Sequence, residues 1–227
     1  PLFQGVFRDI SERLDRMREL QRQNERLDEF ASVVSHDLRN PMSVAHGRAT
    51  LLDEECESEH IDPLLTALDR MGTIIEDTLV LARNGRRVGD METVSIADMI
   101  GNCWQTVDAP GITLEFVDEF SIRADPDRLK HICENLVRNA VDHGGDTVTV
   151  RVGQADEDTI YFEDDGPGIP EGERDAVFDP GYSSVPDGTG FGLAIVQGLA
   201  EAHDWTVTLT ESDAGGARFE FGGVEIE

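Results

Sequence analysis

The chain has 227 residues, 39% of them apolar, and carries 47 acidic against 19 basic side chains, for a net charge of −28 at pH 7. This length and apolar content suffice for one or two domains with buried cores, while the negative charge repels a phosphate backbone and argues against nucleic-acid binding. No run approaches the roughly 18 consecutive apolar residues of a membrane-spanning helix, so we expect no membrane contact within this chain and a cytoplasmic location.

The first part of the chain is predicted to be helical. Residues 1–12 are typical of the end of a strand followed by a helix start, and the first residue, Pro1, suggests a fragment of a longer protein. From there to about Leu38 no glycine or proline interrupts a helix. Heptad positions a and d hold Met17, Leu20, Asn24, Leu27, Ala31 and Val34. This pattern slightly favours a parallel dimer over an amphipathic helix packed on its own domain.

A second helix is predicted after an acidic, irregular stretch from Asp53 to His60. Asp62 is a suitable N-cap, Pro63 suits the first helical position, and the helix should end near Asn84-Gly85. Its apolar face comprises Leu64, Leu65, Leu68, Met71, Ile75, Leu79 and Ala82. The two helices form an antiparallel hairpin over residues 13–90, which lacks a closed core until two copies form a four-helix bundle. We therefore expect a homodimer.

From about Val94 the pattern changes to short strands that alternate with helices. Strands are predicted at Ile112–Phe116, Ser121–Ala124, Thr147–Gly153, Thr159–Glu163, Trp205–Thr210 and Ala217–Phe221, and helices over residues 97–107, 126–142 and 191–203. This alternation indicates a second domain of the α+β class over residues 91–227, which follows a linker at Asn84–Asp90.

Two glycine-rich runs and an asparagine pair stand out in this second domain. The run 164–170 (DDGPGIP) follows a predicted strand, and the run 188–193 (GTGFGL) opens a predicted helix. Glycines allow backbone amides to approach phosphate, and a helix N-terminus attracts it. Asn135 and Asn139 share one helix face and could bind a hard cation such as Mg²⁺ together with phosphate oxygens. They could also be solvated surface residues, but asparagine is a poor helix former and here interrupts an apolar face.

These motifs, taken in order, resemble those of the histidine kinases. Asn135-Leu-Val-Arg-Asn139, Asp164-x-Gly166-x-Gly168, Phe178 with Tyr182, and Gly188-x-Gly190-x-Gly192 are similar to the family's N, G1, F and G2 boxes. The sequence around His36-Asp37-Leu-Arg39-Asn40-Pro41 resembles its phosphoacceptor box. Residues 1–12 also resemble the end of a PAS sensor domain. The resemblance implies a multi-domain chain, with an all-α dimerising hairpin followed by an α/β sandwich with a Bergerat-type ATP site.

The resemblance also implies roles for individual residues. His36 would be the phosphorylated nucleophile, Asp37 would fix its tautomer, and Asn40 would serve a phosphatase reaction. Asp164 would accept a hydrogen bond from the adenine amino group, and Asn139 with Asn135 would hold Mg²⁺. Residues 179–190 would form a lid over ATP. The full set expected to bind nucleotide is Asn135, Arg138, Asn139, His143, Asp164, Gly166, Gly168, Ile169, Tyr182, Gly188, Thr189, Gly190, Gly192 and Leu193.

The sequence departs from the family in one respect, and it leaves alternatives open. Members often carry a basic residue shortly after the second asparagine, where this chain has Asp142-His143; Arg138 or His143 could take that place. The expected partner is the receiver domain of a response regulator. One alternative is an ATPase of the gyrase or chaperone type, which uses a glutamate at the position of Asn135. A second is a non-catalytic nucleotide-binding dimer that regulates a partner.

Composition adds two further expectations. Only one basic residue, Lys130, is lysine, and this acidic, lysine-poor surface resembles proteins of salt-loving archaea more than an ordinary solubility adaptation. Cys56, Cys103 and Cys133 show neither a CxxC pair nor an even count, so we expect small buried hydrophobic side chains in a reducing compartment.

Overall fold

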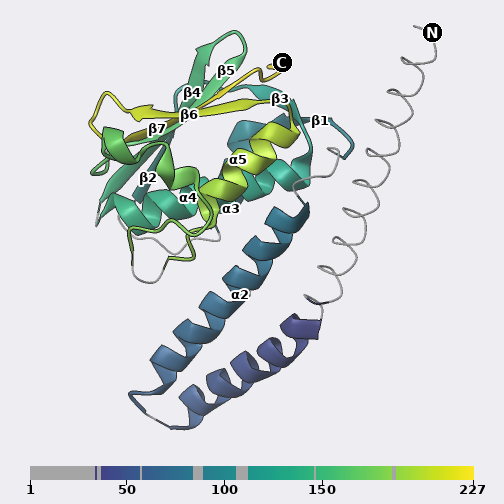
Figure 1. Cartoon of the computed structure of the whole chain (residues 1–227), viewed down its shortest axis with the longest axis vertical. Helices are drawn as coiled ribbons and strands as arrows, with labels where there is room; N and C mark the ends of the chain where they lie inside the picture. The colour runs from purple at the N-terminus through teal and green to yellow at the C-terminus, as the bar shows by residue number, and fades with distance from the viewer. Residues whose placement is uncertain are drawn as a thin grey trace, which may run out of the picture. The chain divides into compact units, whose positions relative to one another are not determined.

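The computed structural model of the chain describes Val34 and residues 37–56, 58–83, 89–105, 112–145, 147–185 and 188–227. The chain divides into two compact units, Pro1–Gly85 and Arg86–Glu227, which we call the hairpin unit and the sandwich unit (Figure 1). The predicted PAS remnant at residues 1–12 and the heptads before Val34 lie outside the described residues.

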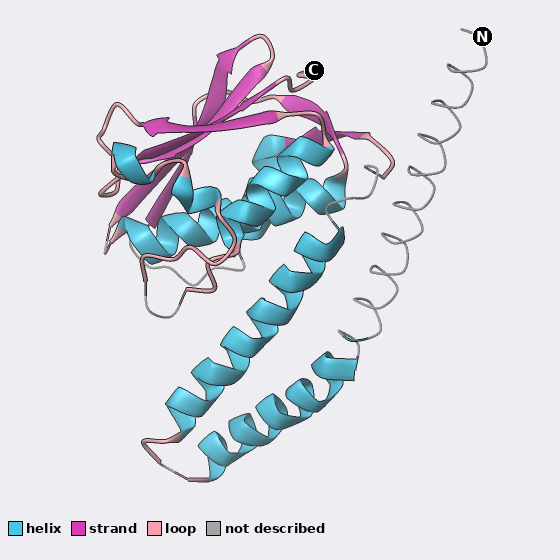
Figure 2. Cartoon of the chain, in the orientation of Figure 1, coloured by secondary structure: helices cyan, strands magenta, loops and turns pink. Residues whose placement is uncertain are grey.

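Two antiparallel helices make up the described part of the hairpin unit, residues 37–55 and α2 (Ile61–Arg83), as Figure 2 shows. Two ion pairs connect them, Arg39–Glu76 at 3.2 Å and His46–Asp69 at 3.1 Å. The pairs are seven residues apart on each helix but in opposite order, as an antiparallel arrangement requires. No helix among the described residues is both long and apolar enough to cross a bilayer.

The ends of these helices differ in detail from the prediction. Helix α2 begins at Ile61, so Asp62 is not its N-cap but lies in its first turn, where a carboxylate still interacts favourably with the helix dipole. The other helix continues through Asn40 and Pro41 without a break.

Apolar side chains of the hairpin unit are only partly covered. Ala49, Ile61, Leu68 and Leu79 are buried. Large apolar side chains with at least a third of their surface exposed are Leu38, Val44, Leu51, Leu52, Leu64, Met71 and Ile74. Val44 and Leu51 are seven residues apart on one helix, as are Leu64 and Met71 on the other, so each helix has an exposed apolar stripe.

The sandwich unit alternates strands and helices. Its elements are β1 (Glu92–Ser95), α3 (Ile96–Gln105), β2 (Ile112–Phe116), β3 (Ser121–Ala124), α4 (Pro126–Gly144), β4 (Val148–Asp156), β5 (Thr159–Asp164), the 3₁₀ turns η1 (Glu171–Glu173) and η2 (Ala176–Phe178), α5 (Gly192–Ala202), β6 (Thr206–Glu211) and β7 (Ala217–Gly222). The main sheet has the order β2-β4-β5-β7-β6, with β2 and β4 parallel and the other pairs antiparallel.

Helices α3, α4 and α5 cover one face of this sheet and form a two-layer α/β sandwich (Figures 1 and 2). Buried residues alternate along the strands, with Val148, Val150 and Val152 on β4 and Phe219 and Phe221 on β7, as expected for a sheet with one covered face. The core between the layers therefore fixes how β5 and the two helices α4 and α5, which carry the predicted site, lie relative to one another.

Two strands were predicted incompletely. Strand β1, which was not predicted, has only four residues and pairs with β3 in a separate two-stranded sheet. Strand β4 extends to Asp156 rather than Gly153, because its hairpin with β5 continues across a register shift between Gln154 and Asp156. Short, half-exposed strands and hairpin extensions carry little hydrophobic signal.

The prediction of three buried cysteines was wrong for Cys56, which is exposed and whose thiol donates to the Leu52 carbonyl oxygen at 3.3 Å. Cys103 and Cys133 are buried, as predicted. Burial raises the pKa of the Cys103 thiol to about 11 and also raises the pKa of Cys133, so both remain protonated and unreactive.

Candidate active site

Helix α4 positions the two asparagines. Asp125 caps the helix and Pro126 occupies its first turn. Asn135 is buried, and its amide nitrogen donates to the His131 carbonyl oxygen at 2.8 Å, which directs the carboxamide oxygen away from the helix backbone. A Cβ atom placed on Gly192 would lie 3.0 Å from Asn135 Oδ1 and 3.8 Å from Asn139 Oδ1. The structure therefore brings both carboxamide oxygens to the first residue of α5.

Asn139 carries an unsatisfied polar atom. Its amide nitrogen is buried and has no hydrogen-bond partner in the described part of the chain. Such an atom costs roughly 1–3 kcal/mol unless a partner is supplied. An unpaired donor beside two carboxamide oxygens and a helix N-terminus fits a phosphate group with a bound Mg²⁺.

Asp164 ends strand β5 and is held by the backbone of two separate loops. Its Oδ1 accepts from the Gly166 amide at 2.9 Å and from the Ala217 amide at 3.2 Å. Its Oδ2 makes no hydrogen bond with the described residues. Burial raises the pKa of this carboxyl group, and the two amide hydrogen bonds oppose that shift. The side chain is thus oriented with one oxygen anchored and the other available to a donor.

The predicted glycines lie where a side chain could not be accommodated. Gly168 has φ +69°, and a Cβ there would come within 2.6 Å of the Gly215 carbonyl oxygen. Gly190 has φ +71°, and a Cβ there would come within 2.5 Å of the Gly181 carbonyl carbon. A Cβ on Gly166 would come within 3.1 Å of Gly144 Cα, at the end of α4. These contacts bring the first glycine run against the end of α4 and the Gly215 turn, and the second run against the start of the predicted lid.

The predicted lid, residues 179–190, is described except for residues 186 and 187. The Gly181 amide donates to the Gly190 carbonyl oxygen at 2.8 Å and closes the base of the loop. The Tyr182 hydroxyl donates to Glu173 Oε2 at 2.6 Å, and this bond raises the pKa of Tyr182. Ser184 Oγ lies 3.4 Å from His143 Nδ1 and so connects the lid to the end of α4.

The remaining residues that were predicted to bind nucleotide differ in their exposure and in their hydrogen bonds. The Ile169 carbonyl oxygen accepts from Arg174 Nε at 3.0 Å, whereas Arg138 is exposed on α4. The Thr189 hydroxyl accepts from the Phe191 amide at 3.4 Å just before α5. Gly188 and Leu193 are both partly buried.

Sequence reasoning missed the residues that hold Asp164 from behind. Ser212 is buried, and its hydroxyl donates to the Asp164 carbonyl oxygen at 2.7 Å and accepts from the Gly216 amide at 2.9 Å. A Cβ on Gly216 would overlap the Asp164 backbone. The Gly215-Gly216 pair was the available signal, because paired glycines between two strands indicate a close backbone approach.

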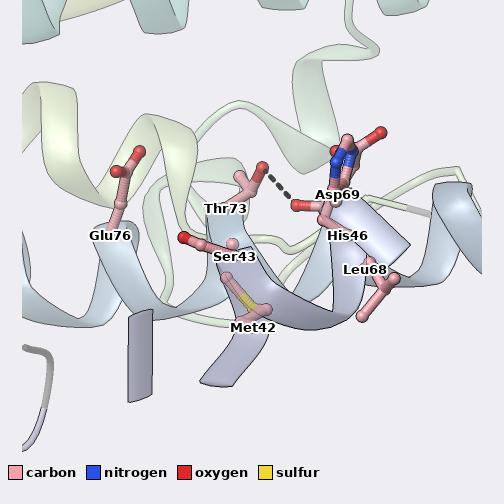
Figure 3. Close-up of a pocket in the computed structure, with 9 residues that line it drawn as sticks. Met42, Ser43, His46, Leu68, Asp69, Thr73 and Glu76 are labelled. Carbon is pink, nitrogen blue, oxygen red and sulfur yellow. Dashed lines mark hydrogen bonds and ion pairs between the residues drawn. The ribbon is translucent and has the colours of Figure 1, made fainter. Parts of the chain in front are cut away.

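In the hairpin unit, His36 lies outside the described residues, while Asp37 and Asn40 are exposed on their helix. A pocket of about 460 Å³ begins at Met42 and lies between the two helices (Figure 3). The ion-paired side chains of His46 and Asp69 lie together at one side of it, and the Thr73 hydroxyl donates to the Asp69 carbonyl oxygen at 3.3 Å. Its lining is completed by Ser43, Gly47, Leu68, Gly72 and Glu76.

Each of the two units matches the model of a known protein family. The family model for histidine kinase-, DNA gyrase B- and HSP90-like ATPases matches residues 124–225, and that for the His Kinase A (phospho-acceptor) domain matches residues 26–87. The sandwich unit thus has the fold class of these ATPases. The two matches together span most of the chain, and over the same region the chain is similar to curated sensor histidine kinases.

Individual relatives agree with this assignment. The chain is 32% identical over 211 residues to the sensor histidine kinase ZraS of Klebsiella oxytoca, covering 86% of this chain and 45% of the relative. The structure of full-length ShkA in complex with AMPPNP has a TM-score of 0.68 at 25% identity, over 88% of this chain and 46% of ShkA. The mycobacterial sensor histidine kinase MprB has a TM-score of 0.51 at 26% identity, over 60% of this chain and 97% of that structure. The chain spans less than half the length of the curated relatives it matches.

Proposed function

We propose that this chain is the core of a two-component sensor histidine kinase, which phosphorylates His36 with ATP and transfers the phosphoryl group to an aspartate of a response regulator. The convergence of Asn135, Asn139 and Gly192, with an unpaired buried amide at their centre, is the observation that carries the proposal. ShkA, a relative of similar fold, was solved in complex with AMPPNP, an ATP analogue, which supports a nucleotide at the corresponding place.

The geometry supports a role for each of the site residues. Asp164 Oδ2 accepts a hydrogen bond from the adenine amino group while Oδ1 stays anchored to the backbone. The carboxamide oxygens of Asn135 and Asn139 would hold Mg²⁺, which would supply positive charge beside the phosphates. The amides at the start of α5 and the lid glycines face the phosphates. His143 or Arg138 supplies the basic group that the family places nearby.

The hairpin supplies the acceptor. A ring nitrogen of His36 attacks the γ-phosphorus, the bond to the bridging oxygen breaks, and ADP leaves. Asp37, the next residue on the helix, accepts the ring proton and fixes the tautomer. Asn40 lies one turn further along the same continuous helix, where a carboxamide can orient water for a phosphatase reaction on the partner.

The exposed apolar stripes on the two hairpin helices support a homodimer. A single hairpin leaves Val44, Leu51, Leu64 and Met71 uncovered, and pairing with a second copy would bury them in a four-helix bundle. The pocket that begins at Met42, six residues after His36, is the surface on which we place the receiver domain.

The alternative ATPase reaction is disfavoured by the position of the glutamate. Glu134 pairs with Lys130 at 3.6 Å and with His131 at 3.4 Å, and the hydrogen bond from His131 lowers the pKa of Glu134. A carboxylate with a lowered pKa that is held by a lysine and a histidine on its own helix is a poor base for activating water. Asn135, at the position where those ATPases carry glutamate, cannot act as a base.

The sequence supports three further parts of the proposal, which concern salt adaptation, an upstream domain and the cellular location. The composition supports a protein adapted to high salt, as in halophilic archaea, and residues 1–12 support an upstream PAS domain. We place this part of the protein in the cytoplasm, where response regulators and ATP are found.

Incubation with γ-labelled ATP and Mg²⁺ in high salt tests the proposed function. We expect phosphate on the protein that is stable in base and labile in acid, and His36→Gln should abolish it while leaving ADP affinity within about twofold, since the two lie in different units. Normal labelling of His36→Gln would contradict the kinase. ATP hydrolysis without labelling would favour the gyrase-type ATPase, and tight nucleotide binding with neither activity would favour the regulatory dimer.

A further inference from the structure

One buried carboxylate, Asp125, connects two backbone segments of the sandwich unit. Its Oδ1 accepts from the amides of Asp127 at 3.1 Å and Arg128 at 3.3 Å and so caps α4. Its Oδ2 accepts from the Gly89 amide at 2.8 Å. Gly89 is the first described residue after residues 84–88, the segment through which the chain leaves the hairpin unit. The same side chain thus caps the asparagine-bearing helix and holds the incoming linker.

The backbone of Asp125 makes a third connection, to the end of α5. Its amide donates to His203 Nε2 at 3.1 Å, while His203 Nδ1 donates to the Leu199 carbonyl oxygen at 2.8 Å. The ring stacks on Trp205 with 4.3 Å between ring centroids. Burial lowers the pKa of His203, so the ring stays neutral and can accept at Nε2. His203 is the C-cap of α5.

These contacts lie at one end of a pair of antiparallel helices whose other end is the nucleotide site. Asn135 is ten residues from Asp125, and Gly192 is eleven residues from His203, which is about 15 Å of helix in each case. Asn135 and Gly192 touch, as do Asp125 and His203. Helices α4 and α5 therefore meet at two places, the start of α4 against the end of α5 and the middle of α4 against the start of α5.

The absence of a side chain on Gly89 allows its backbone to approach Asp125 closely. A Cβ atom there would lie 2.8 Å from Asp125 Oδ2, closer than ordinary Cβ contacts. The amide reaches the carboxylate only because no side chain separates them. Arg128 Nε, 3.5 Å from the same oxygen, places a positive charge beside the carboxylate.

We propose that Asp125 is a positioning residue for phosphorylation of His36, because it fixes the linker to the helix pair that carries the nucleotide ligands. With the link intact, the direction in which the linker leaves the sandwich unit is set by α4 and α5. With the link broken, the nucleotide still binds, but His36 reaches its γ-phosphate less often. This role rests on the kinase function proposed above.

Asp125→Asn in the whole chain separates linking from capping. Asparagine caps helices as well as aspartate does, so its side-chain oxygen should still accept hydrogen bonds from the Asp127 and Arg128 amides. Its NH₂ group then faces the Gly89 amide, donor against donor. We expect ADP affinity within about twofold of wild type and melting temperature little changed. The Gly89 amide hydrogen should exchange about tenfold faster than in the wild type. The rate of His36 phosphorylation at saturating ATP should fall about tenfold.

A second pair of variants guards against an effect on folding. Gly89→Ala breaks the link from the other side and should reproduce the slow phosphorylation, whereas Gly101→Ala on α3, where a Cβ would meet nothing within 4 Å, should behave as wild type. Equal losses of ADP affinity and phosphorylation rate would make Asp125 a cap only and overturn the proposal. An unchanged rate in both link variants would overturn it as well. Absence of His36 labelling in the wild type would instead overturn the kinase function, and this role with it.

Discussion

The two units of this chain bury their apolar side chains in opposite ways. The sandwich unit encloses a core between sheet and helices in which Ile122, Val137 and Val196 are fully buried. The hairpin unit leaves an apolar stripe on each helix, with Val44 65% exposed and Leu51 50% exposed. A closed core is stable alone, whereas an exposed stripe requires a partner surface. We infer that nucleotide binding depends on one copy of the chain and that presentation of His36 depends on two.

We expect the largest effect from a charge placed in the exposed apolar stripe of the hairpin unit. Met71→Glu would place a carboxylate in the proposed bundle interface, where burial of an unpaired charge costs several kcal/mol. We expect a monomer by light scattering, loss of hairpin helicity, and phosphorylation reduced at least a hundredfold, with ADP affinity unchanged because the sandwich unit has its own core.

Thr66→Glu is the matched control, since Thr66 is also exposed on α2 but lies on another side of the helix from Leu64 and Met71. It adds the same charge and should leave the dimer intact. A Met71→Glu protein that remains a dimer with normal phosphorylation would place the interface elsewhere. Loss of ADP binding in that variant would show that the sandwich unit is not self-sufficient.

The sequence predicted the larger features of both units because those features have strong local signals. The helix predicted over residues 126–142, the strand predicted at Ala217–Phe221 and the ordered glycine boxes all depend on residue types at short spacing. The start of α2 was misplaced by two residues, and β1 was missed, because helix ends and four-residue strands have weak signals.

The support behind the site could not be predicted in the same way. Ser212 reaches Asp164 across 48 residues of sequence, and Gly89 reaches Asp125 across 36. A buried serine or a lone linker glycine has many ordinary explanations, and only the tertiary fold shows which backbone atoms they meet. The roles of Asn135, Asn139 and Asp164 came from the ordered motifs, but the atoms that orient them came from the structure.

Asp164→Asn should lower the ATP affinity of the sandwich unit and leave the hairpin unit unchanged. Asparagine can keep Oδ1 bonded to the Gly166 and Ala217 amides, so the fold should survive. Its NH₂ group would replace Oδ2 and oppose the adenine amino group. A buried hydrogen bond lost in this way costs roughly 1–3 kcal/mol, or about 5- to 150-fold in ATP affinity. Calorimetry should detect this, with hairpin dimerisation unchanged; unaltered affinity with intact adenine selectivity would refute Asp164 as the adenine acceptor.

The smallest expected effect is a pH dependence confined to the sandwich unit. Burial lowers the pKa of His203, so below the unfolded value of about 6.5 the unfolded chain binds a proton that the folded chain resists. The free energy of unfolding should therefore decrease as the pH falls below about 6.5, by at most about 1.4 kcal/mol per pH unit from this group. Both tryptophans, Trp104 and Trp205, lie in this unit, so urea titrations followed by tryptophan fluorescence report on it alone.

Comparison of variants isolates the contribution of His203 from that of the many carboxylates. His203→Gln removes the titrating ring, so its unfolding free energy should fall less than that of the wild type between pH 7 and pH 5.5, although it starts lower because the Trp205 stacking is lost. Identical pH dependence in the wild type and His203→Gln would mean that the ring binds a proton in the folded chain as readily as in the unfolded chain, so that below about pH 6.5 the folded ring is protonated. In that case Nε2 could not accept from Asp125, and the connection between α4 and α5 would depend on the helix packing alone.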